Sequence, residues 1–141
     1  MFLSEYPYKV DAKGRIPFPP KFKEELKPGL VLTRGSEGCI AVYPKSEWAK
    51  ITEEMAVLPP SSSKERRRTR FFFGGAFPAD LDAQGRVVLP VPLREYARIE
   101  HDTVMVGCNN YVEVWNQEAW EAESALASGE NRQAGEVVEE R

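Results

Sequence analysis

The sequence contains an internal repeat, and this repeat limits the possible folds more than any other feature. The stretch VDAKGRIPFP at 10–19 returns as LDAQGRVVLP at 81–90, at an offset of 71 residues. Further along, apolar and aromatic residues recur at an offset of 72, which implies one inserted residue. Self-similarity of this kind indicates duplicated structural units. We expect two homologous units at 5–50 and 77–122, a bridge between them at 51–76, and a tail at 123–141.

Alternating apolar residues and turn residues predict the same elements in both units. In the first unit, apolar residues occupy every second position in 6–10, before a turn, and again in 16–18, after it. This pattern is typical of a β-hairpin. A short helix opened by proline, two further short strands and a longer helix follow, with that last helix starting near Ser46 and near Gln117. So few strands bury too little for one unit to be stable alone. We expect the units to close about a pseudo-two-fold axis into one small barrel or sandwich with interleaved strands.

The Asp-x-x-Gly turn has a physical explanation in both copies. Asp at the first position and Gly at the fourth is typical of a type I turn followed by a left-handed residue. Asp11 and Asp82 are expected to accept hydrogen bonds from backbone amides within the turn. Gly14 and Gly85 are expected to take a positive φ that a side chain would resist.

An arginine follows the glycine of each turn. Since strand side chains alternate, Arg15 and Arg86 are expected to point away from the apolar face, at equivalent places on the surface. Lys13 adds a charge to the first turn only, because Gln84 takes its place in the second. One interpretation is a clamp, in which each arginine binds its own aspartate. The other is a site for an anion with two-fold character, usually double-stranded DNA, and both can hold together.

The bridge contains a second basic stretch, followed by three phenylalanines. Its positive residues are Lys64, Arg66, Arg67, Arg68 and Arg70. A run of this kind usually forms the solvated face of a helix. Arg66, Arg67 and Arg70 are secondary candidates for phosphate contacts, ranked below the turn arginines. The phenylalanines at 71–73 are expected to anchor the core or a subunit interface.

The composition argues against several classes of protein. No apolar run approaches the roughly 20 residues that span a bilayer, and no secretory signal is recognisable, so we expect a cytoplasmic protein. Cys39 and Cys108 are isolated and are expected to be buried rather than paired in a disulfide. His101 has no Cys or His neighbour at ligand spacing, and no nucleotide-binding loop or nucleophile elbow is present. We therefore expect no metal, no cofactor, no small-molecule substrate and no enzymatic activity.

The charges are unevenly distributed. The net charge of −3 arises in the tail, where residues 121–141 hold six glutamates against two arginines. The remainder of the chain is near neutral, which permits a local basic surface. The start of the tail is expected to extend a helix and its end to be mobile.

The paired Asp-x-x-Gly-Arg turns, each followed by an aromatic strand and a Trp-containing helix start, resemble the MraZ family. This family is related to the AbrB and SpoVT DNA-binding proteins of bacteria, and the resemblance covers about residues 1–125. Both Asp-x-x-x-Arg motifs that mark the family are intact. The resemblance implies a mainly β fold with short helices (α+β), a duplicated swapped-hairpin barrel formed by the two halves.

The resemblance also implies a function. It implies ring-shaped homo-oligomers, association with the nucleoid, and sequence-specific binding to direct repeats in the promoter of the division and cell-wall gene cluster, usually as a repressor. Arg15 and Arg86 would then contact DNA, with Asp11 and Asp82 supporting the turns. Two other hypotheses remain open. One is an assembly protein whose arginine turns pair with acidic residues of a neighbouring protomer, and the other is binding to RNA.

Overall fold

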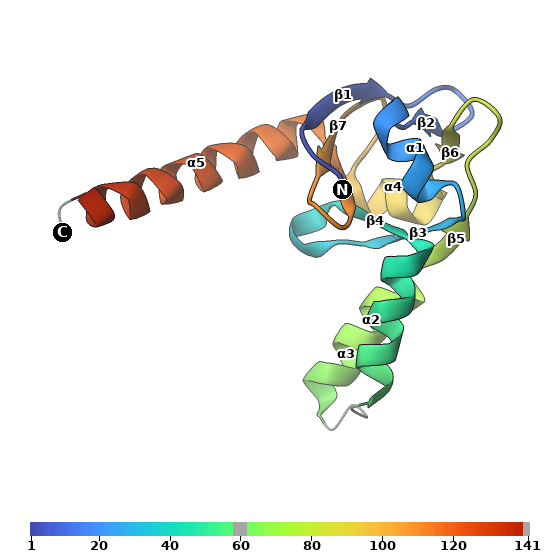
Figure 1. Ribbon diagram of the computed structural model, residues 1–141, viewed down its shortest axis with the longest axis horizontal. Helices are drawn as coiled ribbons and strands as arrows, with labels where there is room; N and C mark the ends of the chain where they lie inside the picture. Colours follow the sequence, from blue (N-terminus) through green and yellow to red (C-terminus); the bar gives the residue numbers. More distant parts are fainter. Residues whose placement is uncertain (58–61, 140–141) are drawn as a thin grey trace.

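The structure is a computed structural model that describes the backbone of residues 1–57 and 62–139, with side chains described for 1–55 and 62–130. A β-rich body carries two helical projections, the α2–α3 pair and α5 (Figure 1). The strands are β1 Glu5–Lys9, β2 Arg15–Pro17, β3 Leu30–Arg34, β4 Ile40–Pro44, β5 Phe77–Ala79, β6 Arg86–Val88, β7 Asp102–Gly107 and β8 Val112–Asn116. The helices are α1 Pro20–Leu26, α2 Lys45–Val57, α3 Ser63–Gly74, α4 Val91–Ala97 and α5 Gln117–Glu139, with a 3-10 turn at Ser36–Gly38.

The strands form two antiparallel sheets whose order is symmetric about the duplication. The larger sheet has the order β1-β7-β8-β4-β3-β5, and the smaller one pairs β2 with β6. Exchanging the first unit for the second leaves both orders unchanged. Ala41 pairs with Glu113 at the centre of the large sheet, and Ile16 pairs with Val87 at the centre of the small one. This confirms a duplicated α+β fold with interleaved strands and a pseudo-two-fold axis.

The local hairpin expected within each unit is wrong in its strand pairing, although its turn forms. β1 pairs with β7 over five residues, and β2 pairs with β6, so both strands find their partners in the other unit. Within the first turn, the Asp11 N–H donates to the Arg15 carbonyl at 3.0 Å and the Gly14 N–H donates to the Asp11 carbonyl at 2.9 Å. Pairing between the units is more favourable than a hairpin within each unit, because it joins both units in a single sheet of six strands. Separate hairpins would leave more strand edges exposed.

The inner side of the small sheet lies in the core. Ile16 is fully buried, and Phe18, Val87 and Leu89 are at most 3% exposed. These four residues hold both turns against a single apolar cluster that spans the two units. The helices that follow are short in both units, and each begins directly after a proline, at Pro19 or Pro90.

The longer helices start where the sequence predicts, at Lys45 and Gln117. Ser62 caps α3 by accepting a bond of 3.1 Å from the Glu65 N–H. None of the side chains of α3 is buried. Of its phenylalanines, Phe72 stacks on Trp48 with a centroid distance of 5.2 Å, whereas Phe71 is 40% exposed beneath the Arg34 guanidinium.

The residues expected to form a tail continue α5 as far as Glu139. Residues 140–141 lie outside the described part of the chain, so the expected mobility of the tail's end stays a prediction. Within the described residues, no helix has the length and apolar character needed to cross a bilayer.

Candidate nucleic-acid interface

The two turns have the geometry that their sequence predicts. Oδ1 of Asp11 accepts bonds of 2.9 Å from the N–H groups of Lys13 and Arg15. Oδ1 of Asp82 accepts the equivalent two bonds in the second turn, also at 2.9 Å. Gly14 and Gly85 have φ values of +78° and +75°, and each donates its N–H to the carbonyl of the turn aspartate at 2.9 Å. Both turns are therefore rigid and nearly identical.

Each turn arginine is clamped by its own aspartate. Arg15 Nε donates to Asp11 Oδ2 at 2.7 Å, and Arg86 Nε donates to Asp82 Oδ2 at 3.0 Å. Backbone donation from the arginine N–H is the main cause that lowers the pKa of each aspartate, partly opposed by desolvation, so both carboxylates are charged at neutral pH. The clamp interpretation is thus confirmed. The ion pair with the aspartate engages Nε and so fixes the direction of the guanidinium. The side chain remains 28% exposed in both arginines.

The pairing of β2 with β6 brings the two arginines together. Arg15 lies opposite Val88, and Arg86 lies opposite Pro17, so that the two arginines are diagonal neighbours on one face of the small sheet. Diagonal neighbours in an antiparallel pair have Cα atoms on the order of 7–8 Å apart. Val88 is 54% exposed, which leaves this face open to solvent. A basic, exposed face with two-fold character results.

Two further cations lie against the turns and were missed by sequence reasoning. A Cβ placed on Gly14 would lie 3.2 Å from Cζ of Arg94, and one placed on Gly85 would lie 2.2 Å from Cε of Lys23. Lys23 belongs to α1 and Arg94 to α4, so each helix carries a cation across to the turn of the other unit. Lys23 and Arg94 are separated by the offset of 71 that relates the arginines, and this equivalence was the signal available in the sequence.

Not every predicted basic residue lies at this face. Lys13 is exposed in the first turn, as expected. Arg66, Arg67 and Arg70 are exposed on α3, which projects with α2 away from the small sheet (Figure 1). The structure therefore separates the basic stretch of α3 from the two turns.

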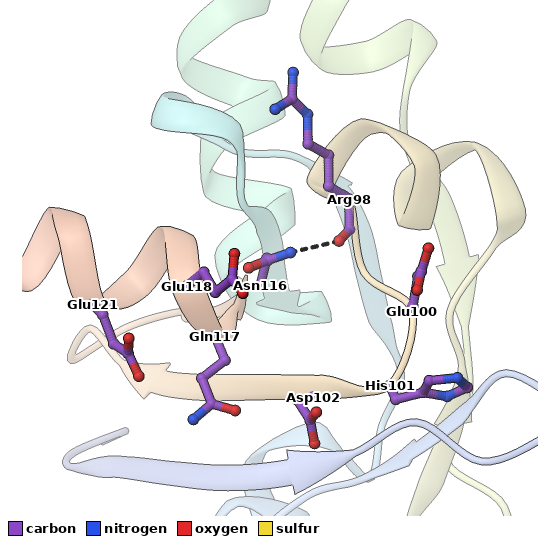
Figure 2. A pocket seen from close by; sticks show the side chains of 8 residues that line it. All are labelled: Arg98, Glu100, His101, Asp102, Asn116, Gln117, Glu118 and Glu121. Atoms are coloured by element: carbon purple, nitrogen blue, oxygen red, sulfur yellow. Dashed lines mark hydrogen bonds between the residues drawn. The ribbon is translucent and has the colours of Figure 1, made fainter.

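A different surface, at the base of α5, is mainly acidic. Its pocket has a volume of about 570 Å³. The lining comes from the segment after α4, the start of β7, the end of β8 and the first turns of α5 (Figure 2). The lining residues are Arg98, Glu100, His101, Asp102, Asn116, Gln117, Glu118 and Glu121. Asn116 Nδ2 donates to the Arg98 carbonyl at 2.6 Å. Its four carboxylates make this pocket unsuited to phosphate.

Two cysteines and His101 are the other reactive side chains singled out in the sequence. Cys39 is buried, as expected, whereas Cys108 is only half-buried, and both are free thiols. Burial is the main cause that raises the pKa of both, to about 11 for Cys108. His101 is exposed. In the described part of the chain, no group of His, Cys, Asp or Glu side chains is arranged to hold a metal ion.

Comparison with known proteins identifies relatives of the whole chain. A family model described as "MraZ protein, putative antitoxin-like" matches residues 1–71 and again residues 72–136. A protein of Dehalococcoides mccartyi named "Transcriptional regulator MraZ" is 43% identical over 141 residues, covering 99% of both chains. Proteins with the same name from Desulforamulus reducens (39% identical, 98% of this chain and 97% of the relative) and Syntrophomonas wolfei (47%, 85% and 84%) are also similar.

Proposed function

The chain belongs to the MraZ family, and from this premise we propose that it is a transcriptional regulator that binds double-stranded promoter DNA through its two Asp-x-x-Gly-Arg turns. It recognises direct repeats upstream of the division and cell-wall gene cluster and represses transcription, including that of its own gene. It acts in the cytoplasm, on the nucleoid, and has no enzymatic activity. The relatives are named transcriptional regulators, which is not a class of enzyme.

The observation that carries the proposal is the placement of Arg15 and Arg86 on one exposed face, related by the pseudo-two-fold axis. Each guanidinium is held at Nε, and Arg86 also donates Nη2 to Gln84 Oε1 at 3.2 Å, so little conformational entropy remains to be lost when the terminal nitrogens bind a ligand. Arginine is the side chain that most often binds the edge of guanine, and it also binds phosphate. Asp11 and Asp82 orient the arginines, and Gly14 and Gly85 shape the turns, while Lys13 adds a charge beside the first.

The double variant Arg15→Ala, Arg86→Ala tests this function. Random duplexes retained by the wild-type protein are sequenced, and the affinity for the enriched duplex is measured at fixed salt by fluorescence anisotropy. Each lost base contact should cost about 1 to 3 kcal/mol of binding free energy and relax the sequence preference. The control variant Lys21→Ala, Arg98→Ala removes two exposed cations that lie outside both turns and outside α3, and should bind the enriched duplex like the wild type. Equal affinity of the turn variant and the wild type would refute the proposal.

We also propose that the protein forms a homo-oligomer. Two projecting helices of opposite charge support this part of the proposal, because α3 is strongly basic whereas the first turns of α5 are acidic and adjoin the acidic pocket (Figure 1). A contact between α3 of one copy and α5 of the next is head-to-tail, and such contacts generate rings when the rotation closes. Phe72 of α3 packs on Trp48 within one chain, but Arg67 and Arg70 are exposed and can reach a neighbouring copy.

Charge reversal tests the contact. The variants Arg67→Glu, Arg70→Glu and Glu118→Arg, Glu121→Arg should each have a smaller mass by size-exclusion chromatography with light scattering. An equimolar mixture of the two should regain the larger mass, because both kinds of contact are then complementary. Assembly that neither variant weakens would contradict the proposed contact.

The competing hypotheses are separated by the same reagents. If the arginine turns join protomers, the variant Arg15→Ala, Arg86→Ala will lose its oligomeric mass rather than only its DNA binding. If the ligand is RNA, the RNA counterpart of the enriched duplex will bind more tightly than the DNA.

A further inference from the structure

We infer that Lys23 and Arg94 bind DNA phosphates on either side of the turn arginines, each reaching the turn of the opposite unit across a glycine. The inference rests on the proposed function and assigns different roles in DNA binding to the two pairs of cations. Arg15 and Arg86 read the sequence, while Lys23 and Arg94 supply affinity that does not depend on sequence.

The first support is that the arrangement occurs twice. Lys23 lies in α1 and passes over Gly85 of the second unit, and Arg94 lies in α4 and passes over Gly14 of the first. The backbone joins the same segments, because the Gly14 carbonyl accepts from Leu89 N–H at 2.8 Å. The equivalent bond in the other half runs from Phe18 N–H to the Gly85 carbonyl at 3.2 Å. A cation of one unit thus lies against the turn of the other in both halves.

The glycines make room for these cations. At Gly85, a Cβ would approach Cε of Lys23 to 2.2 Å and Nζ to 2.7 Å, closer than atoms can pack. At Gly14, Cζ and Nη2 of Arg94 would both lie 3.2 Å away. The glycine of the motif therefore has two roles: it adopts the positive φ, and it lets a charged side chain lie directly against the turn.

The second support is that the charges of Lys23 and Arg94 are not neutralised within the chain. Neither residue forms an ion pair with any part of the chain that the structure describes. Arg94 donates Nε to the Leu89 carbonyl at 3.0 Å, which fixes its stem and leaves both terminal nitrogens without a partner among the residues that the structure describes. The carboxylates of the turns form their ion pairs with Arg15 and Arg86. Unpaired cations that are partly shielded from water favour an anionic ligand.

Arg15 and Arg86 are held differently from Lys23 and Arg94, and this suits the two pairs to different tasks. A guanidinium fixed by a carboxylate presents a planar donor pair in one direction, as reading a base edge requires. Lys23 ends in a flexible point charge and suits a phosphate, whose position varies little with sequence. Arg94 is held at Nε by a carbonyl rather than by a carboxylate, so its charge is not offset, and its terminal nitrogens can bind phosphate as a pair.

The test uses the full-length variant Lys23→Gln, Arg94→Gln with a labelled random-sequence duplex and with the duplex enriched by the wild type. Each phosphate contact contributes about 0.9 to the slope of log affinity against log salt, so the double variant should lower the slope by about 1.8. At 0.15 M salt this corresponds to roughly fivefold weaker binding per residue and about thirtyfold for both, on each duplex alike. The ratio of affinities for the two duplexes should not change.

Two controls define the outcome. The variant Lys21→Gln, Arg98→Gln removes the same charges from exposed positions of α1 and the end of α4, and should leave the slope unchanged. The variant Lys23→Arg, Arg94→Lys keeps both charges and should retain the wild-type slope. Circular dichroism and the thermal midpoint check that each variant is folded.

Three results would overturn the inference. An unchanged salt slope in a folded Lys23→Gln, Arg94→Gln variant excludes phosphate contacts, and a loss confined to the enriched duplex makes these residues base readers instead. In both cases the proposed function survives if Arg15→Ala, Arg86→Ala still abolishes the sequence preference. If the wild type shows no preference and the arginine variant binds like the wild type, the proposed function fails first, and the inference falls with it.

Discussion

Substitution of Gly85, the glycine of the second turn, tests how much the left-handed conformation of this residue contributes to the stability of the protein. In the variant Gly85→Ala, the new residue must adopt a φ of +75°, a left-handed conformation that costs an L-residue roughly 1–2 kcal/mol. Its Cβ also collides with Cε of Lys23. That side chain is flexible and can rotate away, so the collision should displace Lys23 without a large further loss of stability. We expect the free energy of unfolding to fall by about 1–2 kcal/mol.

Two matched variants separate the two effects. Gly38 has a φ of +85° and no atom within 4 Å of an added Cβ, so Gly38→Ala carries the strain alone. Gly14→Ala carries the same strain and a milder contact with Arg94. All three variants should lose similar stability, whereas Gly85→Ala should in addition reduce the salt slope of DNA binding by about 0.9, since Lys23 is displaced.

Urea unfolding followed by tryptophan fluorescence measures the stability, with an unchanged m-value as the check that the same transition is compared. Wild-type stability in all three variants would refute the reasoning from positive φ. A loss for Gly85→Ala several kcal/mol larger than that for Gly38→Ala would refute the view that the Lys23 side chain yields easily.

Three further predictions concern the turns, the core and the thiols. The folded-state pKa of Asp11 and of Asp82 is lowered, so the stability that these carboxylates provide is present above pH 4 and is lost as the pH falls below it. The variant Asp11→Asn, Asp82→Asn should therefore be less stable than the wild type at pH 7. Its thermal midpoint should also change less with pH between pH 5 and 3. Ile16→Ala, at a fully buried position, should cost about 2–5 kcal/mol in urea unfolding, whereas the exposed Val88→Ala should stay within about 0.5 kcal/mol, and equal losses would contradict the assigned faces. With a pKa of about 11, Cys108 should react with iodoacetamide at pH 8 roughly a hundredfold or more slowly than an ordinary thiol, as followed by mass spectrometry, and labelling as fast as that of free cysteine would show that its thiol is not shielded.

The local chemistry of the turns was predictable from the sequence because it depends on neighbours within four residues. Asp11 caps its own turn, Gly14 supplies the positive φ, and alternation places Arg15 on the side opposite Ile16. The starts of the long helices were predictable for the same reason. The presence of a pseudo-two-fold axis followed from the repeat itself.

The pairing of the strands and the positions of Lys23 and Arg94 were not predictable in this way. A turn sequence specifies how the chain reverses, but it does not specify which strand of the other unit each arm will join. The two cations reach the turns only because α1 and α4 pack on opposite units. Their equivalence in the repeat was visible, but their function depends on contacts between residues about 60–80 positions apart in the sequence.

The symmetric strand order has a consequence for how the sheet is held together. Because the outer strands β1 and β5 pair with strands of the other unit, one unit alone would have to associate with a second copy to complete its sheet. Joining the two units in one chain makes that association intramolecular. A covalent linker commonly holds two partners at an effective concentration of the order of millimolar, so completion of the sheet does not depend on the concentration of the protein. Since each unit has its own sequence, the two turns can carry different residues, as Lys13 and Gln84 do.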